Sequence, residues 1–386
     1  MSKKQSDKSL EQFISNYPQL NKWSTSPFIR SGPREEKSWR LEAESFSVDL
    51  YHNLLQKNVP PIHHNKLRIL FAHFSPFDDE MEGLGLPLYA SLAFPNSSID
   101  FTYDKGGTDC YKYRIVKNQV NKLKELRTQY DMIIGRSGAF INMKVRKNQS
   151  LMMDLSRLKI NIKTMSYSHN LRFADHYFEE EDMCPPPSPL YLDRVEDFIS
   201  QHKKENIIIV SGTMWYVKNQ LQMIEQIDAQ LLNGYTLAFI GPLKDKSYIK
   251  KIRHVADCKN IDYHILGKVN KRLAQDIATL SKMAIIPQDQ RSFGQPKGYP
   301  RVVGESIGSR CLTLCNSPIT VPDFYANSCL QYSHEKGDFN MCLEKAIGIL
   351  KDDNYLETWN WSPYTMEDHC KKTLNQCWEL YKGTYE

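Results

Sequence analysis

The sequence predicts an α/β protein with two domains, each built on a largely parallel sheet. Between residues 206 and 316, short apolar runs that end in Gly, Pro or another turn-forming residue alternate with stretches of helical length. Such alternation is typical of parallel strands joined by helices. A length of 386 residues is sufficient for two domains of ordinary size. Polar residues follow the predicted strand ends, which is where ligands of such sheets bind.

Residues 1–65 are predicted to form an extension with one helix. The part from residue 1 to residue 38 is polar and rich in Ser, Lys and Pro, so we expect it to be loosely ordered or to lie on the surface. A helix is expected within Ser38–Gln56, before Pro60 and Pro61 stop it.

Residues 66–200 are predicted to form the first domain. Four strands are expected, at Lys66–Phe74, Ile99–Tyr103, Tyr130–Gly135 and Ile162–Tyr167. The loop Ser75–Gly85 is acidic and leads into a helix that reaches Ala93. The Pro-rich segment Cys184–Pro189 excludes a helix or a central strand, so we expect a linker or surface crossing before a helix at Leu192–Gln201.

Residues 201–365 are predicted to form the second domain. Its expected strands are Asn206–Thr213, Thr236–Pro242, Ile261–Gly267, Met283–Pro287 and Cys311–Asn316. Its expected helices are Gln220–Leu232, Ser247–Ala256, Asn270–Leu280 and one that begins at Pro300. A last helix is predicted at Met366–Tyr381, within the C-terminal residues 366–386.

The segment Lys297–Glu305 is predicted to be a tight loop that leads directly into a helix. Gly298 permits the turn and Pro300 suits the first helical position. Free N–H groups at such a helix start bind phosphate, and Arg301 can add charge-assisted hydrogen bonds. Glu305 lies one turn further on the same face and can hold a vicinal diol. An ordinary helix start with a surface ion pair has the same local pattern, so the surrounding strands decide its interpretation.

Residues 206–325 resemble the donor-binding domain of GT-B glycosyltransferases, most of all the retaining family four. That family has a strand, a Gly and, six residues later, a Lys that grips the donor diphosphate; Gly212 and Lys218 match this pattern. It also has a motif of two Glu separated by seven residues, often with Gly-x-Pro-Arg inside it. The residues that match this second motif are Gly298, Pro300, Arg301 and Glu305.

The resemblance implies a GT-B architecture, with two Rossmann-like domains whose parallel sheets face a central cleft. It also implies that the C-terminal helix crosses back to the N-terminal domain. Glu305 would bind the nucleotide ribose, and the amides near Tyr299 to Arg301 would face the phosphates. From this resemblance and from the positions after predicted strand ends, the expected donor-binding residues are Gly85, Gly212, Thr213, Lys218, Gly241, Gly267, Val269, Gly298, Tyr299, Pro300, Arg301 and Glu305.

The chain departs from the family pattern at two positions. Lys297 stands where the family has its first Glu, close to the transferred sugar, and Thr213 stands where an Arg is frequent. A Lys at position 297 either neutralises the leaving diphosphate, contacts an acidic sugar or is simply solvated.

Three residues of the first domain complete the catalytic candidates with Lys297. Asp79 and Glu80 either bind an acceptor hydroxyl or act as a base, and a solvated acidic loop is an equal alternative. His169 follows the fourth strand, where it either contacts a sugar or phosphate or is a structural residue.

The predicted function is that of a glycosyltransferase of the EC 2.4 class. It moves a sugar from a UDP- or GDP-linked donor to a glycan, lipid-linked or protein-linked hydroxyl, without a metal and with retention. The nucleotide sugar is a co-substrate, and no cofactor is expected. A nucleotide-sugar epimerase of the same fold, a nucleic-acid glucosyltransferase and a non-catalytic nucleotide-sugar-binding protein are the alternatives.

Composition and charge agree with this function. The net charge is +5, from 50 basic and 45 acidic residues in small dispersed groups, so we expect no stable nucleic-acid partner and at most peripheral membrane contact. The nine Cys include no CxxC pair. With a polar start to the chain, they predict reduced thiols and a cytoplasmic protein. Cys370 and Cys377 have helical spacing, which favours a packed helix face over a metal site.

Overall fold

The computed structural model divides the chain into two units, each described here by itself. One unit holds Met1–Gly32 and Leu192–Pro363, and the other holds Pro33–Tyr191 and Tyr364–Glu386. The residues that the structure describes are 10–20, 61–64, 66–72, 85–103, 108–110, 113–117, 131–135, 163–166, 176–177, 189–269, 271–288, 302–316, 321, 323–333, 337–362 and 364–382.

The unit that holds Pro33–Tyr191 and Tyr364–Glu386 is called the N-terminal unit, and the other the C-terminal unit. The N-terminal unit contains a seven-stranded sheet in the order β3-β4-β2-β1-β5-β6-β7. Its strands are β1 (Arg68–Ala72), β2 (Ser98–Tyr103), β3 (Thr108–Cys110), β4 (Tyr113–Lys117), β5 (Met132–Gly135), β6 (Lys163–Ser166) and β7 (His176–Tyr177). All pairs are parallel except that between β3 and β4. The four predicted strands are confirmed as β1, β2, β5 and β6. The other three strands, β3, β4 and β7, lie toward the edges of the sheet and were not predicted.

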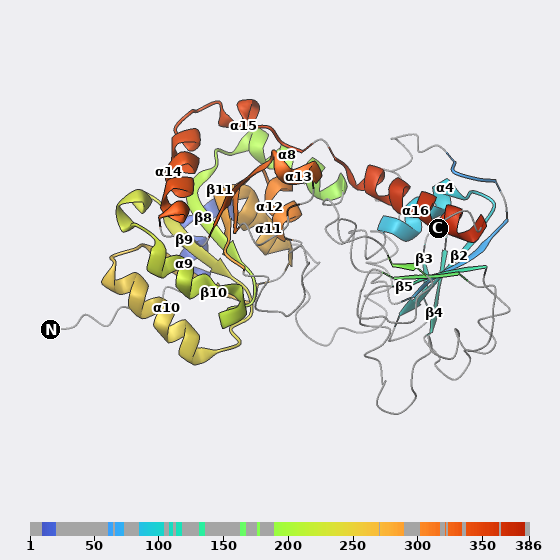
Figure 1. Ribbon diagram of the computed structural model, residues 1–386, viewed down its shortest axis with the longest axis horizontal. Helices are drawn as coiled ribbons and strands as arrows, with labels where there is room; N and C mark the ends of the chain where they lie inside the picture. The colour runs from blue at the N-terminus through green and yellow to red at the C-terminus, as the bar shows by residue number, and fades with distance from the viewer. Residues whose placement is uncertain are drawn as a thin grey trace. The chain divides into compact units, whose positions relative to one another are not determined.

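Two helices cover part of this sheet, α4 (Leu86–Ala93) and α16 (Met366–Lys382). They pack against each other, so the C-terminal helix crosses back to the N-terminal sheet, as predicted (Figure 1). The buried side of α16 includes Cys370, Cys377 and Trp378. The Trp378 ring lies 4.1 Å from the ring of His63 and 6.2 Å from that of Phe94, between ring centroids.

The C-terminal unit contains a six-stranded parallel sheet in the order β10-β9-β8-β11-β12-β13. Its strands are β8 (Glu205–Ser211), β9 (Thr236–Ile240), β10 (Tyr263–Gly267), β11 (Ser281–Ile286), β12 (Leu312–Asn316) and β13 (Cys329–Tyr332). In chain order this is 3-2-1-4-5-6, the order of a Rossmann sheet, and the direction of winding reverses between β8 and β11. The five predicted strands are confirmed, and β13 is an additional short edge strand.

Helices lie on both faces of this sheet, with α9, α10 and α14 on one side and α11 and α12 on the other (Figure 1). The helical segments are α1 (Leu10–Asn16), η1 (Pro18–Leu20), α8 (Pro189–Gln201), η5 (Tyr216–Lys218), α9 (Gln220–Gln226), η6 (Ala229–Leu232), α10 (Lys246–Cys258), α11 (Lys271–Leu280), α12 (Val302–Gly308), α13 (Asp323–Ala326), α14 (Asp338–Leu350) and α15 (Tyr355–Thr358).

The predicted continuous helix Gln220–Leu232 is wrong. The structure ends α9 at Gln226, because Ile227 is extended (ψ 128°). Asp228 then starts the separate 3-10 helix η6, since its side chain accepts a hydrogen bond from the Gln230 N–H (2.9 Å). A short polar side chain that caps a new turn competes with continuation of the helix.

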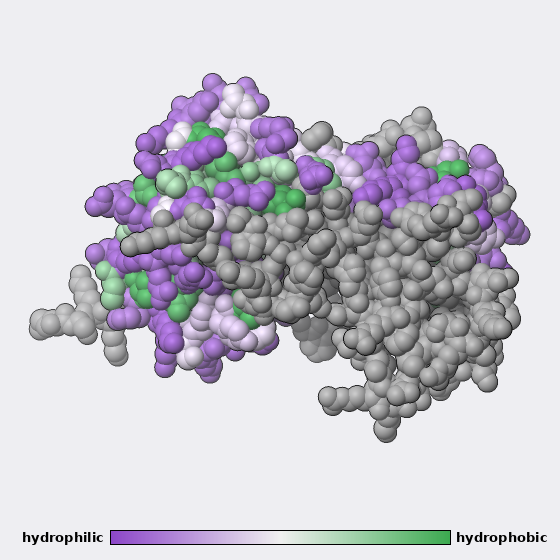
Figure 2. All heavy atoms as spheres, viewed as in Figure 1, coloured by the Kyte–Doolittle hydropathy of each residue, from purple (hydrophilic) through white to green (hydrophobic). Residues whose placement is uncertain are grey.

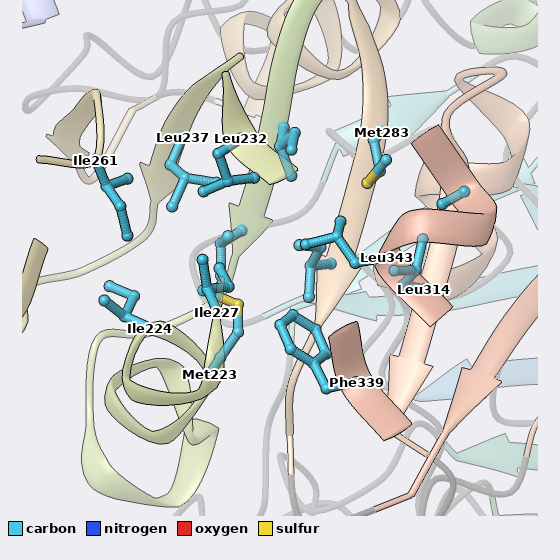
Figure 3. Packing of buried hydrophobic residues seen from close by; sticks show 14 of the residues in the cluster. Met223, Ile224, Ile227, Leu232, Leu237, Ile261, Met283, Leu314, Phe339 and Leu343 are labelled. Carbon is cyan, nitrogen blue, oxygen red and sulfur yellow. The ribbon is translucent and has the colours of Figure 1, made fainter. Parts of the chain in front are cut away.

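The two faces of the sheet form two apolar clusters. Along β8, Ile208 and Val210 belong to one cluster, and Ile207 and Ile209 to the other. A strand buried on both faces accounts for the continuous apolar run in its sequence. Figure 3 shows the first cluster, where the labelled side chains of α9, the sheet and α14 meet: Met223, Ile224, Ile227, Leu232, Leu237, Ile261, Met283, Leu314, Phe339 and Leu343.

Residues 10–20 of the N-terminal extension pack against the second cluster through two buried side chains, while the other side chains are exposed or partly exposed. Phe13 of α1 and Leu20 of η1 are fully buried in the second cluster. The Phe13 ring lies 5.2 Å from the ring of His264 in β10. Of the two alternatives expected for residues 1–38, residues 10–20 fit a segment that lies on the surface, and two buried side chains hold it there. The helix expected at Ser38–Gln56 lies outside the described residues.

On the face shown in Figure 2, the described residues are mostly hydrophilic, and apolar residues form small separate areas. Within the described part of the chain, none of the helices combines the length and the apolarity needed to cross a bilayer.

Candidate functional site

Three glycines end neighbouring strands at the carboxyl edge of the C-terminal sheet. The Gly212 N–H donates to the Ile240 carbonyl oxygen (2.8 Å), and the Gly241 N–H donates to the Gly267 carbonyl oxygen (2.9 Å). Hydrogen bonding thus continues past β8 and β9 into the loops. The backbone of all three glycines has positive φ, with values of 137°, 150° and 70°. The sequence predicted these three positions from the strand ends, and the structure brings them together.

The backbones of Gly212 and Gly241 are in close contact. A Cβ atom on Gly241 would lie 2.0 Å from the Gly212 carbonyl oxygen, far inside contact distance. A side chain is therefore excluded at Gly241 by space as well as by its φ angle. The backbones of Gly212 and Gly241 are partly exposed, whereas Gly267 is buried.

The side chain of Lys218 reaches from the loop after β8 to the loop after β11, the two strands between which the sheet reverses its winding. Lys218 ends η5, the turn that follows β8, and its Nζ donates to Oε1 of Gln288 at 2.5 Å. Gln288 lies just after β11, the strand adjacent to β8. In open α/β sheets ligands bind outside the carboxyl ends of the strands at such a switch point. The ammonium group of Lys218 therefore lies where an anionic ligand is expected.

The loop that carries Lys218 is held in a defined shape. Asn219 has a left-handed backbone (φ 61°) between η5 and α9. The buried side chain of Gln220 donates from Nε2 to the Thr213 carbonyl oxygen (3.1 Å). Tyr248 of α10 hydrogen-bonds the Leu221 N–H through its hydroxyl oxygen (2.8 Å). Thr213 thus contributes a fixed backbone to the loop.

Gln288 and Asn316 belong to this site but were not among the predicted residues. The Asn316 side chain donates from Nδ2 to the Gln288 carbonyl oxygen at 3.4 Å, and both residues are buried. Asn316 ends β12, the next strand after β11. The sequence signal that could have identified them is a polar residue at the end of a predicted strand, the same signal that identified other residues of the site. Their link to Lys218 depends on strand order, which local sequence does not encode.

The electrostatics of Lys218 favour an anionic ligand. Burial lowers the pKa of its ammonium group from the ordinary value of 10.5. Gln288 is a neutral amide, so this contact does not cancel the positive charge. A partly desolvated cation is stabilised by an anion that binds beside it.

Glu305 lies in the first turn of α12, the helix that connects β11 to β12 and packs against both. Because the two strands are parallel, this helix runs back from the carboxyl edge, and its first turn lies at that edge. Glu305 is partly exposed, while its neighbours Gly304 and Ser306 are buried. The Glu305 carbonyl oxygen accepts from the Ser309 N–H (3.0 Å) and the Ser309 hydroxyl (2.6 Å).

Two further predicted residues lie apart from this set. Val269 follows β10 and packs against the second apolar cluster. Gly85 precedes α4 in the other unit and has ordinary helical angles (φ −55°, ψ −59°). The predicted residues that lie outside the described part of the chain are Asp79, Glu80, His169, Lys297, Gly298, Tyr299, Pro300 and Arg301. Among the residues that are described, no group of three or more His, Cys, Asp or Glu is arranged to hold a metal.

Comparisons of the whole chain agree with this architecture. No family model matches, and no curated protein matches. Among solved structures, AviGT4, a glycosyltransferase involved in avilamycin A biosynthesis, is 13% identical, with a TM-score of 0.52 over 82% of this chain and 98% of that one. A glycosyltransferase from Rickettsia africae is 13% identical, with a TM-score of 0.50 over 83% of this chain and 99% of that one.

A third similar structure is an α-glucosyltransferase in complex with UDP and a 13-mer DNA. It is 11% identical, with a TM-score of 0.51 over 81% of this chain and all of that one (100%). At such identities the likeness concerns the fold. The chain has two Rossmann-like sheets and a C-terminal helix that returns to the N-terminal sheet. The similarity also covers nearly the whole of each of these solved structures. This chain has a GT-B fold, the fold of these similar structures.

Proposed function

We propose that the protein is a glycosyltransferase that transfers a sugar from a nucleoside-diphosphate sugar to a hydroxyl acceptor. The observation that carries this proposal is the contact between Lys218 and Gln288 across the switch point of the C-terminal sheet. A cation at that position, beside glycines that leave the backbone accessible, suits a diphosphate. All three similar structures described above are glycosyltransferases by name.

In the proposed reaction the diphosphate is the leaving group. Negative charge develops on it as the bond to the sugar breaks, and Lys218 stabilises that charge. Glu305 holds the ribose hydroxyls, and Arg301 with the amides near Tyr299 and Pro300 binds the phosphates. We propose that the reaction proceeds with retention and without a metal.

The remaining site residues are proposed to have the roles that the sequence predicts for them. Lys297 lies next to the transferred sugar in this proposal and selects the donor, because a cation favours different sugar oxygens from those a carboxylate favours. Asp79 and Glu80 bind or activate the acceptor hydroxyl, and His169 contacts a sugar or a phosphate. The acceptor is proposed to be a glycan or a lipid- or protein-linked hydroxyl, and the protein is proposed to act in the cytoplasm.

A nucleic-acid glucosyltransferase is the second candidate, because one of the similar structures is an α-glucosyltransferase bound to DNA. A DNA acceptor would bind with strong dependence on salt, since phosphate contacts release counterions. Transfer to DNA that falls steeply as salt rises would support this candidate over a glycan acceptor.

Release of nucleoside diphosphate from a panel of UDP- and GDP-sugars tests the proposed function. Donor binding is measured on the same panel by thermal shift, because a bound donor raises the melting temperature. A glycosyltransferase binds at least one donor and slowly hydrolyses or transfers its sugar. If the protein binds a donor and does neither, it is a nucleotide-sugar-binding protein and the proposal is wrong.

Replacing Glu305 by Ala is expected to weaken donor binding about tenfold to 100-fold, because loss of hydrogen bonds to a charged group costs about 1.5–3 kcal/mol. The ribose is shared by nucleoside and nucleoside diphosphate, so affinity for both falls by a similar factor. Isothermal titration calorimetry with uridine or guanosine and the matching diphosphate measures this. An unchanged affinity for both, in a folded variant, would remove Glu305 from the donor site.

Sugar transfer is expected to continue in excess EDTA. In the proposed site the leaving diphosphate is stabilised by Lys218, by Arg301 and by the backbone amides near Tyr299 and Pro300. These groups take the electrostatic role that a metal would otherwise have. The initial rate with and without EDTA, followed by readdition of Mg²⁺ or Mn²⁺, measures this. Complete loss that is restored by a divalent ion would show that transfer depends on a metal.

A further inference from the structure

Two loops at the carboxyl edge of the C-terminal sheet lie side by side and carry exposed aromatic and apolar side chains. The loop after β8 pairs with the loop after β9 through a bridge between Met214 and Leu243. The Met214 N–H also donates to the Pro242 carbonyl oxygen (2.9 Å). We call Trp215, Tyr216, Leu243 and Lys244 the rim patch, because these two pairs of consecutive residues lie on the two loops.

Two side chains of the rim patch are more exposed to solvent than is usual for large apolar residues. Tyr216 is 61% exposed and Leu243 is 48% exposed. In the described part of the chain one other large apolar side chain is comparably exposed, Met341 at 64%. Single exposed apolar residues are common, whereas here two of them lie on adjoining loops.

A cation is held against the aromatic residues. The Lys244 ammonium lies 3.5 Å from the centroid of the Trp215 ring, and the Tyr216 ring meets that of Trp215 nearly edge to face, at 4.9 Å and 76°. A cation over an aromatic face is attracted by the ring quadrupole. Lys244 therefore covers part of Trp215, and Tyr216 is the ring that remains widely exposed beside a fixed positive charge.

The surrounding loops are positively charged. Residues 212–219, 241–247 and 267–269 contain four Lys and one Asp. The Asp is Asp245, and its carboxylate is engaged in capping α10, accepting from the Ser247 N–H (2.9 Å) and the Tyr248 N–H (3.1 Å). Lys244, Lys246 and Lys268 are exposed. The charge of this edge is complementary to an anion.

We propose that the rim patch is an acceptor subsite that binds an anionic sugar ring, such as a uronic acid or a phosphorylated sugar. This rests on the proposed function of the protein. The face of Tyr216 packs against the C–H groups of the sugar, and Lys244 pairs with its carboxylate or phosphate.

The arrangement favours one sugar ring over a strand of nucleic acid. Single-stranded nucleic acid stacks successive bases on several open aromatic faces along a basic groove. Here the face of Trp215 is shared with Lys244, so the patch offers one open ring. A single aromatic platform beside a held cation matches the size and charge of one anionic monosaccharide unit.

The test uses the full chain with three probes, namely tetragalacturonate, neutral maltotetraose and a ten-residue oligothymidylate. Calorimetry in the presence of saturating nucleoside diphosphate is expected to show binding of tetragalacturonate, with the neutral sugar at least tenfold weaker. Tyr216→Ala and Lys244→Gln should each weaken tetragalacturonate binding about tenfold, whereas Tyr216→Phe should retain it. Met341→Ala and Lys250→Ala are matched controls, because Met341 is equally exposed and Lys250 is an exposed lysine on α10.

Three results would overturn the subsite. In the first, the wild type binds neither tetragalacturonate nor a glucuronate- or phosphate-bearing oligosaccharide. In the second, it binds the neutral sugar equally well. In the third, it binds the oligothymidylate and this binding depends on Tyr216. Affinity for the nucleoside diphosphate is measured separately in every variant and should not change. Failure of the donor to bind at all would instead refute the proposed function, so the two failures are distinguishable.

Discussion

Replacing Lys218 by Met is expected to reduce affinity for a nucleoside diphosphate about 100-fold and to leave affinity for the nucleoside within about twofold. Hydrogen bonds to charged groups contribute about 1.5–3 kcal/mol, and 1.4 kcal/mol corresponds to a factor of ten. Only the diphosphate carries the groups that Lys218 is proposed to contact. Met keeps a similar volume in this half-buried position, so the fold should be retained. Calorimetric titration with both ligands measures the two affinities.

The dependence on pH gives a second readout of the same residue. Burial lowers the pKa of Lys218 from its ordinary value, and the protonated form is the one that attracts phosphate. Diphosphate affinity of the wild type should therefore fall as the pH rises through that lowered pKa, and the Met variant should lose this dependence. The nucleoside titrated over the same range controls for other groups.

Two variants control the interpretation. Lys246→Met removes an exposed lysine at the start of α10 and should change diphosphate affinity little. Gln288→Glu places a carboxylate where Lys218 now meets a neutral amide, which pairs the cation and repels the diphosphate, so it should weaken the diphosphate selectively. Equal losses for nucleoside and diphosphate in Lys218→Met would contradict a phosphate role.

Gly241→Ala is expected to destabilise the protein by about 3–5 kcal/mol, because a strained φ costs about 1–3 kcal/mol and forced overpacking adds a similar amount. The new Cβ would lie 2.0 Å from the Gly212 carbonyl oxygen, so the backbone of the two loops must separate. Because this backbone lines the proposed donor site, diphosphate affinity should fall as well. Urea unfolding followed by circular dichroism measures the loss of stability.

The chain offers a matched control for this prediction. Gly234 also has positive φ (81°), but a Cβ there would have no atom within 4 Å. Gly234→Ala therefore isolates the conformational term and should cost about 1 kcal/mol, the low end for such strain. Equal destabilisation by the two substitutions would mean that the close approach of Gly241 to Gly212 contributes nothing.

The sequence by itself determined most of the strands, the class of fold and part of the site. Apolar runs that end in Gly or Pro recur in the second half because each parallel strand is buried on both faces and then turns sharply. Gly212, Gly241 and Gly267 were identified for the same reason, since each lies at a strand end and adopts a conformation that side chains disfavour. These are local properties, and each is encoded within a few residues.

Only the tertiary structure decided which of these residues meet. Lys218 and Gln288 are 70 residues apart, and they touch because β8 and β11 are neighbours in the sheet. The burial of Phe13 against β10 is of the same kind, since a polar N-terminal segment gives no local sign of its partner. The physical reason is that a strand's pattern depends on its own burial, whereas strand order depends on how the whole chain packs its helices over both faces.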